Sequence, residues 1–358
     1  MKAVVWQGPN RMAVDEWARP ELAAEWVALR PEAAGICGSE VEGYMGRQAN
    51  RRPPLVMGHE FAGVVVEIGP GADPAWLGRH VAVNPIVSCR VCALCRAGRR
   101  NLCPRRRLIG VHEPGGFAEL VTAPQSNLVT LPEGMGARVG ALAEPLANGV
   151  HAARLALAET HITGVGAVIG AGAIGVLALQ AARAAPSLPH GGRGSGWGES
   201  SSAVDRLHVL ELDPARRGQA AALGADAAHG SPDDLREALR RETGGLGADF
   251  AIDAVGRVET RQLAVASVRP GGRVVLLGLH DDATSFGAHD LVRREVHVTG
   301  SYAYTDADFG HALDLLADGR AGLGELPSVQ PLEAAPALFA RLAAGPTPEV
   351  KLFVAPRR

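Results

Sequence analysis

The sequence has little of what would mark a membrane or nucleic-acid-binding protein. No apolar stretch is long enough to cross a bilayer, so we expect no membrane partner. Lysine occurs only as Lys2 and Lys351, and the formal net charge is −2. Without a basic excess, paired arginines such as Arg51 and Arg52 are interpreted as solvated loop charges, and no nucleic-acid partner is expected. The chain opens on strand-like residues rather than a signal peptide, which favours a cytoplasmic location, where thiols stay reduced.

Cysteine is scarce as well, and four of the five cysteines lie in one C-x2-C-x2-C-x7-C run: Cys89, Cys92, Cys95 and Cys103. Four thiolates so close together can surround one metal ion as a tetrahedron, the closed arrangement of structural zinc. Disulfides are disfavoured in the cytoplasm, and a ferredoxin-type cluster would place its last cysteine after three residues rather than seven. The run therefore predicts a structural zinc site, with an empty thiol loop as the remaining alternative.

A second set of possible metal ligands is scattered along the first half of the chain. It consists of Cys37, His59, Glu60 and Glu144, which are one thiolate, one imidazole and one or two carboxylates. Three protein ligands that leave a fourth position open are typical of catalytic zinc, which acts as a Lewis acid. Each residue alone also has an ordinary interpretation, such as a small core cysteine or a helix start at a Glu-Pro pair.

A dinucleotide site is predicted in the second half. A short apolar run, Ala167–Ile169, leads into a G-x-G-x-x-G loop followed by helix-forming residues: Gly170, Gly172, Ala173, Ile174 and Gly175 form the part expected to bind cofactor. Such glycines let the backbone approach a pyrophosphate at a helix N-terminus. Glu211, at the end of the next strand, can accept hydrogen bonds from the ribose hydroxyls and repel a 2′-phosphate, which favours NAD over NADP. Residues 186–202 between these features have a linker composition and are interpreted as a surface loop without catalytic duty.

Together these motifs resemble the zinc-dependent medium-chain alcohol dehydrogenases, and Glu144-Pro145 resembles their sorbitol and polyol dehydrogenase branch. The matching segments are Met1–Val5, Gly58–Glu60, the four-cysteine run, Gly115–Glu119, the glycine loop and Gly271–Val275. The resemblance implies an α/β fold with a GroES-like, mostly-β catalytic domain over residues 1–147. A Rossmann domain with a doubly wound parallel sheet would span 148–302, and residues 303–358 would return to the catalytic domain.

The resemblance also implies two zinc ions per chain and assigns the catalytic ion to Cys37, His59 and Glu144. One thiolate and one carboxylate neutralise Zn²⁺, so we expect Glu60 to be an occasional ligand or one linked through water. Glu40 stands where relatives usually carry an aspartate that holds the zinc histidine by its other ring nitrogen. Its alternative interpretation is a solvated surface charge.

The expected proton relay begins at Ser39, which occupies the family's first relay position, although a helix-capping role is the alternative. Many relatives end the relay in a histidine three residues later, whereas this chain has Glu42, so either this carboxylate takes the proton or the proton leaves through water. In the cofactor half, Arg216 falls where a basic residue often meets the adenosine ribose. With Arg217 it keeps NADP as the second choice of cofactor.

The predicted function is reversible hydride transfer between NAD and a secondary alcohol, such as a diol, polyol, cyclitol or amino alcohol. Two hydroxyl anchors of sorbitol dehydrogenases are missing, because Gly43 and Ala303 stand where those enzymes carry tyrosine and arginine. The alternatives are an NADP-dependent alcohol dehydrogenase or carbonyl reductase, a double-bond reductase, and a non-enzymatic zinc- or NAD-binding protein on the same fold. The family also predicts a homotetramer, with a dimer as the alternative.

Overall fold

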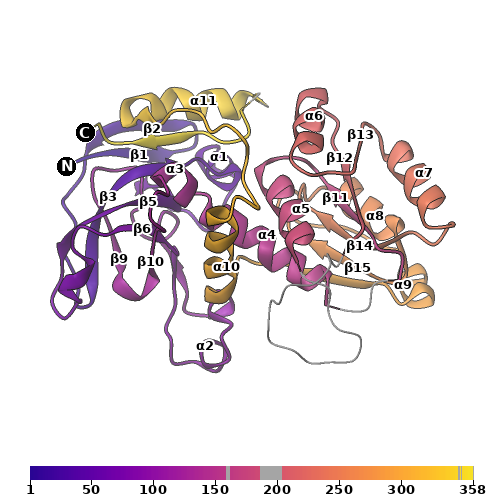
Figure 1. Cartoon of the computed structure of the whole chain (residues 1–358). Coiled ribbons are helices and arrows are strands. Elements are labelled where there is room, and N and C mark those ends of the chain that lie inside the picture. The colour runs from indigo at the N-terminus through magenta and orange to yellow at the C-terminus, as the bar shows by residue number, and fades with distance from the viewer. Residues whose placement is uncertain (159–161, 186–203, 346, 348, 358) are drawn as a thin grey trace. The chain divides into compact units, whose positions relative to one another are not determined.

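The computed structural model describes residues 1–158, 162–185, 204–345, 347 and 349–357 (Figure 1). The chain forms two compact units. Unit 1 consists of Met1–Glu144, Thr305–Asp318 and Glu325–Arg358, and unit 2 consists of Pro145–Tyr304 and Gly319–Gly324. Residues 186–202, interpreted from sequence as a surface loop, lie outside the described residues. No helix in the described part of the chain is long and apolar enough to span a membrane.

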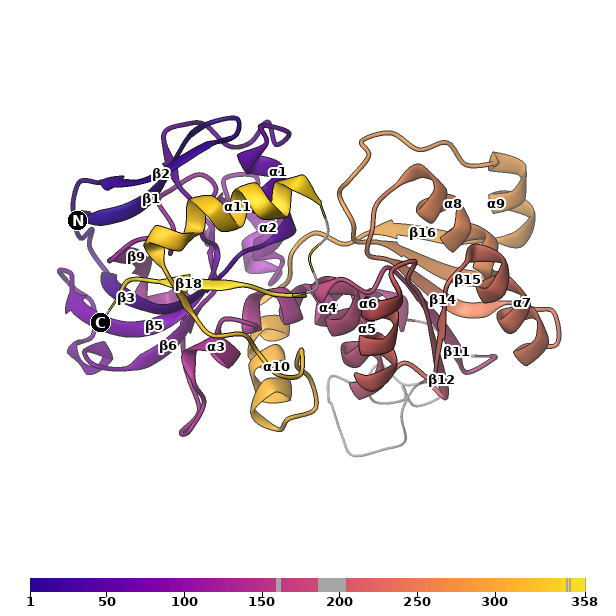
Figure 2. The same ribbon diagram turned by 90° about the horizontal axis from the view of Figure 1, so that it is seen from above.

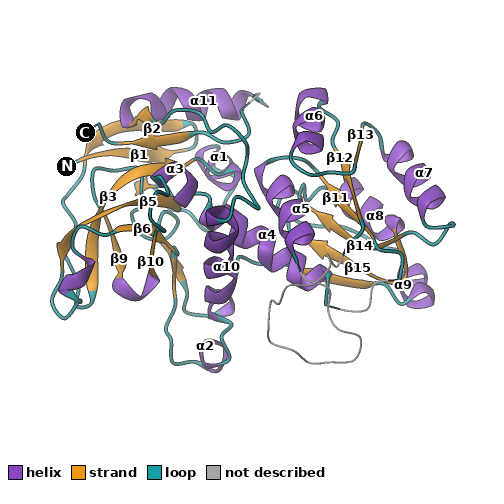
Figure 3. Cartoon of the chain, viewed as in Figure 1, coloured by secondary structure: helices purple, strands orange, loops and turns teal. Residues whose placement is uncertain are grey.

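Unit 1 is built mainly from strands, as Figure 3 shows. Its strands are β1 (Lys2–Gly8), β2 (Arg11–Glu16), β3 (Trp26–Gly35), β4 (Leu55–Val56), β5 (Glu60–Ile68), β6 (His80–Val83), β7 (Ile86–Val87), β8 (Arg107–Leu108), β9 (Val121–Pro124), β10 (Leu128–Thr130), β17 (Gln330–Pro331) and β18 (Phe353–Ala355). The helices are α1 (Gly38–Tyr44), α2 (Ala93–Arg96), α3 (Ala137–Gly140), α10 (Asp306–Ala317) and α11 (Ala335–Ala344), and α4 (Ala143–Ala156) begins here. The main sheet has the order β10-β6-β5-β3-β18-β17, with β9 also paired to β3.

The register of three neighbouring strands in this sheet determines where the site forms. Antiparallel pairing sets Gly35, the last residue of β3, opposite Glu60, the first residue of β5. Phe353 of β18 pairs with Gly35 from the other side. The residues just beyond β3 and just before β5 and β18 therefore meet at one end of the sheet. Helix α11, which Figure 2 shows beside β2 and α1, buries Phe339 in the same core as Phe61.

Unit 2 is a parallel sheet with α5 and α6 on one face and α7 and α8 on the other (Figure 3). Its strands are β11 (Val165–Ile169), β12 (Arg206–Leu210), β13 (Ala227–His229), β14 (Ala248–Asp253), β15 (Val268–Leu276) and β16 (His297–Gly300), and its helices after α4 are α5 (Ala173–Ala184), α6 (Pro214–Ala222), α7 (Pro232–Glu242), α8 (Val258–Ser267) and α9 (Ala288–Arg294). All neighbouring pairs are parallel, and β11 is buried along its whole length, as expected for a strand covered on both faces.

The strand order of unit 2 is β13-β12-β11-β14-β15-β16. Numbered within the sheet, this is 3-2-1-4-5-6, the doubly wound order in which ligands bind where the direction of winding reverses, between the first and fourth strands. The predicted α/β fold with a Rossmann-type sheet and a mostly-β unit is therefore confirmed. Six residues of the carboxy-terminal segment, Gly319–Gly324, belong to unit 2, because Gly322 donates to Gln180 of α5 and Arg320 donates to the Ala184 carbonyl.

Candidate active site and cofactor site

Three of the predicted catalytic-metal ligands meet at the end of the unit 1 sheet. One ligand atom each of Cys37, His59 and Glu60 lies within 4.8 Å of the other two. Cys37 lies between β3 and α1. Glu60 is the first residue of β5 and His59 directly precedes it, so the β3–β5 register brings the three residues together. A thiolate, an imidazole and a carboxylate form a donor set suited to zinc. Glu60 Oε1 is buried without a hydrogen-bond partner among the described residues, so it is available to a cation.

Glu40 supports this cluster through hydrogen bonds, and its alternative interpretation as a solvated surface charge is wrong. It is fully buried, and its Oε1 lies 2.8 Å from Nδ1 of His59. The same oxygen accepts from the backbone amides of Gly58 and His59, at 2.8 and 3.1 Å, while Oε2 accepts from the Cys37 amide at 3.0 Å. Since an ionised carboxylate only accepts, Nδ1 carries the proton and leaves the Nε2 lone pair for a metal.

The electrostatics of the cluster favour positive charge. Burial alone would raise the pKa of Glu40, yet the charge and hydrogen bond of His59 hold it below its usual value. Burial would lower the pKa of His59, but Glu40 and Cys37 raise it well above its usual value. A buried site that stabilises cationic groups in this way is chemically matched to a divalent ion.

Lys351 reaches the cluster from the segment before β18 and forms an ion pair with Oε2 of Glu60. Lys351 is 5% exposed and Glu60 is fully buried. Burial works to lower the pKa of Lys351, and the neighbouring charges of Glu60 and Cys37 raise it above its usual value. The carboxylate of Glu60 is thus charge-balanced, a feature that the sequence analysis did not anticipate.

Ser39 and Arg51 complete the surroundings of Cys37. Ser39 lies in the first turn of α1, and its Oγ is 3.4 Å from Sγ of Cys37. Cys37, not Ser39, occupies the helix N-cap position, so the capping interpretation of Ser39 is wrong. The prediction that Arg51 is a solvated loop charge is also wrong, because it is only 5% exposed and donates from Nη2 to Ser39 Oγ at 3.4 Å. Arg52 is exposed, as predicted.

Two other predicted residues lie apart from the cluster. Glu42 pairs with Arg47 across 3.5 Å, and its side chain is 29% exposed. Glu144 is buried in the first turn of α4, and its carboxylate does not join the group of ligand atoms formed by Cys37, His59 and Glu60. The assignments of Glu42 to the relay and of Glu144 to the metal remain predictions.

The four remaining cysteines form a second cluster, with their sulfur atoms within 4.8 Å of one another. The separations are 3.4 Å for Cys89–Cys103, 3.8 Å for Cys89–Cys95 and 3.9 Å for Cys92–Cys103. All are free thiols, too far apart for a disulfide. Zinc–sulfur bonds of about 2.3 Å in a tetrahedron require sulfurs about 3.8 Å apart, so the cluster fits zinc. Hydrogen bonding from the Val91 amide lowers the pKa of Cys89 to about 5, whereas burial raises that of Cys95 to about 11.

The glycine loop of unit 2 follows β11 at the reversal of strand order. Gly170 has a φ of +94°, and a Cβ on Gly175 would overlap the Gly170 carbonyl oxygen, so glycine is needed for α5 to pack against the strand. Gly172 is the N-cap of α5, and Ala173 and Ile174 begin the helix. Glu211, just beyond β12, accepts from the Ala171 amide at 2.9 Å, which places its carboxylate beside the loop.

The two arginines after β12 differ in their surroundings. Arg217 donates from Nη1 to the carbonyls of Glu211 and Leu212, at 2.9 and 3.3 Å, so it supports the backbone that carries Glu211. Arg216 is partly exposed in the first turn of α6, where its amide donates to Asp213 at 2.9 Å. Its contact with the cofactor ribose remains a prediction.

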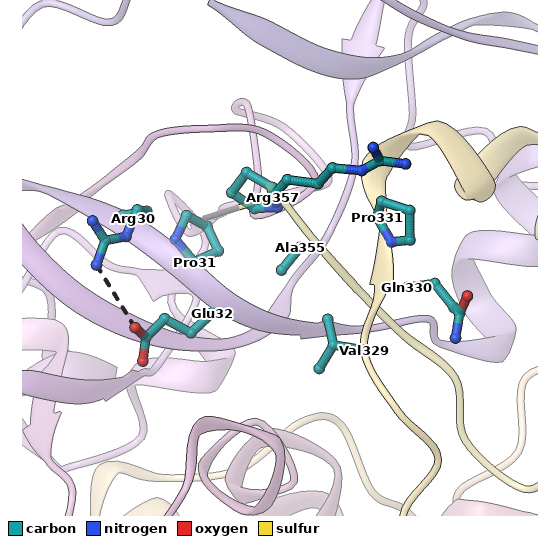
Figure 4. A pocket seen from close by; sticks show the side chains of 9 residues that line it. Arg30, Pro31, Glu32, Val329, Gln330, Pro331, Ala355 and Arg357 are labelled. Atoms are coloured by element: carbon teal, nitrogen blue, oxygen red, sulfur yellow. Dashed lines mark ion pairs between the residues drawn. The ribbon is translucent and has the colours of Figure 1, made fainter.

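A surface groove of unit 1 lies away from this chemistry. It has a volume of about 470 Å³ and is lined by Arg30, Pro31, Glu32, Val329, Gln330, Pro331, Ala355, Pro356 and Arg357. Figure 4 shows these side chains, with the ion pair of Arg30 and Glu32 dashed. None of them is a predicted site residue or a member of either metal-ligand cluster.

Comparisons with known proteins agree with this arrangement. Residues 23–133 match the family model of the alcohol dehydrogenase GroES-like domain, and residues 203–318 match that of the zinc-binding dehydrogenases. The chain is 30% identical to L-galactonate-5-dehydrogenase of Escherichia coli K12, over 89% of this chain and 88% of the relative. It is 32% identical to sorbitol dehydrogenase of Halalkalibacterium halodurans, over 88% of each. The crystal structure of an alcohol dehydrogenase from E. coli CFT073 complexed with NADH matches with a TM-score of 0.86 and 25% identity, covering 99% of each chain.

Proposed function

The chain belongs to the polyol dehydrogenase branch of the zinc-binding medium-chain alcohol dehydrogenases, and we propose that it oxidises a secondary alcohol bearing further polar groups, with NAD as hydride acceptor. It is an enzyme acting on CH–OH groups with zinc and a nicotinamide cofactor, as its motifs predicted. The observation that carries the proposal is the cluster of Cys37, His59 and Glu60, braced by Glu40 and adjoined by Ser39.

The residues of the cluster have separable roles in this proposal. Zinc held by Cys37 and His59, with Glu144 or Glu60 completing the set, would supply Lewis acidity that makes an alcohol hydroxyl more acidic. Glu40 fixes the tautomer and orientation of His59 through its hydrogen bond to Nδ1. The pairing of Glu60 with Lys351 supports the view that Glu60 contributes only occasionally, since its charge is already balanced.

Ser39 is the proposed first acceptor of the alcohol proton. Its hydroxyl can accept from the substrate and donate onwards, and its place 3.4 Å from the Cys37 sulfur supports this role. Glu42 is the proposed outlet of the relay, and the partial exposure of its carboxylate to solvent supports this role. A bound nicotinamide would supply the hydride acceptor, and the share of the protein's own residues is positioning and proton transfer.

The reaction class is tested by NAD⁺ reduction across secondary alcohols, vicinal diols, sugar alcohols, sugar acids, cyclitols and amino alcohols, with zinc counted in the same preparation. We expect turnover and about two zinc ions per chain, one for each ligand cluster. A Cys37→Ala variant should keep about one ion and lose activity. Activity that survives removal of the Cys37 site would contradict the proposed catalytic role of the cluster.

The preference for NAD is assigned to Glu211, whose carboxylate lies beside the glycine loop. Replacing Glu211 by glutamine keeps a hydrogen-bond acceptor but removes the charge that would repel a 2′-phosphate. We expect the ratio of kcat/KM for NADP⁺ to that for NAD⁺ to rise about tenfold. Glu237→Gln, an exposed carboxylate on α7 of the same unit, is the control and should leave the ratio unchanged. An unchanged ratio in Glu211→Gln would remove Glu211 from cofactor selection.

For the assembly, we propose a homotetramer, with a dimer as the alternative. Strand β16 supports this proposal because it is the last strand of the six-stranded sheet and is paired on one side only among the described strands. An edge of this kind can be extended by the same strand of a second copy.

A further inference from the structure

Arg51 donates fewer hydrogen bonds than the other two buried arginines of the described chain. Arg269 forms an ion pair with Asp249 at 2.6 Å, and Arg261 donates to Thr284 at 2.8 Å and to the Gly278 carbonyl at 3.4 Å. Arg51 has no carboxylate within ion-pairing distance among the described residues, and its Nε, like that of Arg261, is buried without a hydrogen-bond partner there. Among the described residues, its guanidinium donates one hydrogen bond, to Ser39 at 3.4 Å. A buried guanidinium with free donors is costly unless something binds it.

Nearby acidic groups offset only part of the cost of burying Arg51. Burial lowers the pKa of the guanidinium below its usual value, and the neighbouring Glu40 and Cys37 act in the opposite direction. Glu40, however, already accepts from three backbone amides and from His59 Nδ1. Both carboxylate oxygens of Glu40 therefore already accept hydrogen bonds. The N–H groups of the Arg51 guanidinium remain available to bind an anion.

The sequence makes room for this side chain at Gly43. A Cβ at Gly43 would lie 2.6 Å from Cδ and 3.0 Å from Nε of Arg51, so any side chain there would displace the arginine. The space beside Gly43 therefore holds a guanidinium next to Ser39, and a guanidinium on this side of the site recognises an anion better than a neutral hydroxyl.

We infer that Arg51 binds a negatively charged group of the substrate, a carboxylate or a phosphate ester, a few bonds from the carbinol that reacts beside Ser39. This inference rests on the proposed function and sharpens its substrate class to acidic polyols, such as sugar acids or sugar phosphates. The two relatives described above are named for a sugar acid and for a neutral sugar alcohol, so their names leave the charge of this substrate open. A guanidinium binds carboxylate and phosphate alike through paired hydrogen bonds, so the anionic group of the substrate can be either of the two.

The test compares matched neutral and anionic substrates on the zinc-loaded enzyme: sorbitol against D-gluconate, xylitol against D-xylonate, and sorbitol 6-phosphate for the phosphate arm. The measured quantity is the ratio of kcat/KM for the anionic to the neutral partner. In Arg51→Gln we expect this ratio to fall about 10- to 100-fold, mainly through KM, because a charge-assisted bond is lost. Arg51→Lys keeps the positive charge but loses the paired N–H donors, so its ratio should lie between those of Arg51→Gln and the wild type. Arg52 is exposed, and Arg52→Gln should give the wild-type ratio.

Two further measurements separate the possible outcomes. Calorimetric binding of D-gluconate, D-xylonate and sorbitol 6-phosphate without NAD⁺ needs no turnover, and we expect Arg51→Gln to weaken it. NADH binding, followed by fluorescence, should be unchanged; a selective loss there would reassign Arg51 to the cofactor phosphates. Equal loss for neutral and anionic substrates in both Arg51 variants, or no anion binding by the wild type, would overturn the inference. If the wild type turned over none of the alcohols tested, that result would instead count against the proposed function.

Discussion

Replacing Lys351 by methionine is expected to lower the free energy of unfolding by about 3–5 kcal/mol, because it leaves the buried charge of Glu60 without its partner. Glu60 is fully buried, and its other oxygen has no hydrogen-bond partner in the described part of the chain. Lys351 is the one ion-pair partner that Glu60 has among the described residues. The measurement is urea denaturation with excess zinc and again with chelator, since a bound cation would offset part of the loss.

The chain offers a matched control, because Lys2 is its only other lysine. Lys2 lies 3.6 Å from Glu333, and its side chain is 58% exposed, so Lys2→Met should leave stability nearly unchanged. In the double variant Lys351→Met with Glu60→Gln, most of the lost stability should return, since the isolated charge is gone. Equal effects of Lys351→Met and Lys2→Met, or no recovery in the double variant, would show that the ion pair is not what stabilises this end of the sheet.

Features that depend on short stretches of sequence could be predicted well. The four-cysteine cluster follows from spacing within one loop, and the glycine loop follows from a strand, a tight turn and a helix that are contiguous in the chain. Cys37, His59 and Glu60 are further apart, yet the family pattern was sufficient to group them, and the register of β3 and β5 explains why they meet. The family resemblance also gave the doubly wound order of the unit 2 sheet.

Features that depend on the burial of a side chain, or on pairing between strands far apart in the sequence, could not be predicted. Nothing in the sequence around Lys351 indicates that β18 pairs beside β3 and delivers an ammonium to Glu60. The Arg51-Arg52 pair looks like a loop charge, and only the packing against Gly43 shows that the first arginine is buried and the second is not. The missing side chain at Gly43 was visible in the sequence, but the residue that fills its space was not.

Replacing Glu40 by alanine is expected to weaken zinc binding at the Cys37 site by about 10- to 100-fold, the usual effect of removing a group that orients a metal-bound histidine. The change would leave His59 without its Nδ1 acceptor and three backbone amides without theirs. Each buried amide left without an acceptor costs roughly 1–3 kcal/mol, so the free energy of unfolding should fall by about 3 kcal/mol or more. Glutamine at this position keeps one acceptor oxygen and should therefore give a smaller loss of zinc affinity and of stability.

Competition with a chromogenic chelator measures this effect, and the zinc proposed for the four-cysteine cluster would provide an internal standard. None of the four cysteines is among the residues that Glu40 supports, so release of that ion should match the wild type while the Cys37 site empties earlier. Equal loss of both ions would indicate general unfolding rather than a local effect. Unchanged affinity at the Cys37 site would mean that the β3–β5 register alone holds His59 in place, and that the buried carboxylate serves the loop before β5 rather than the metal.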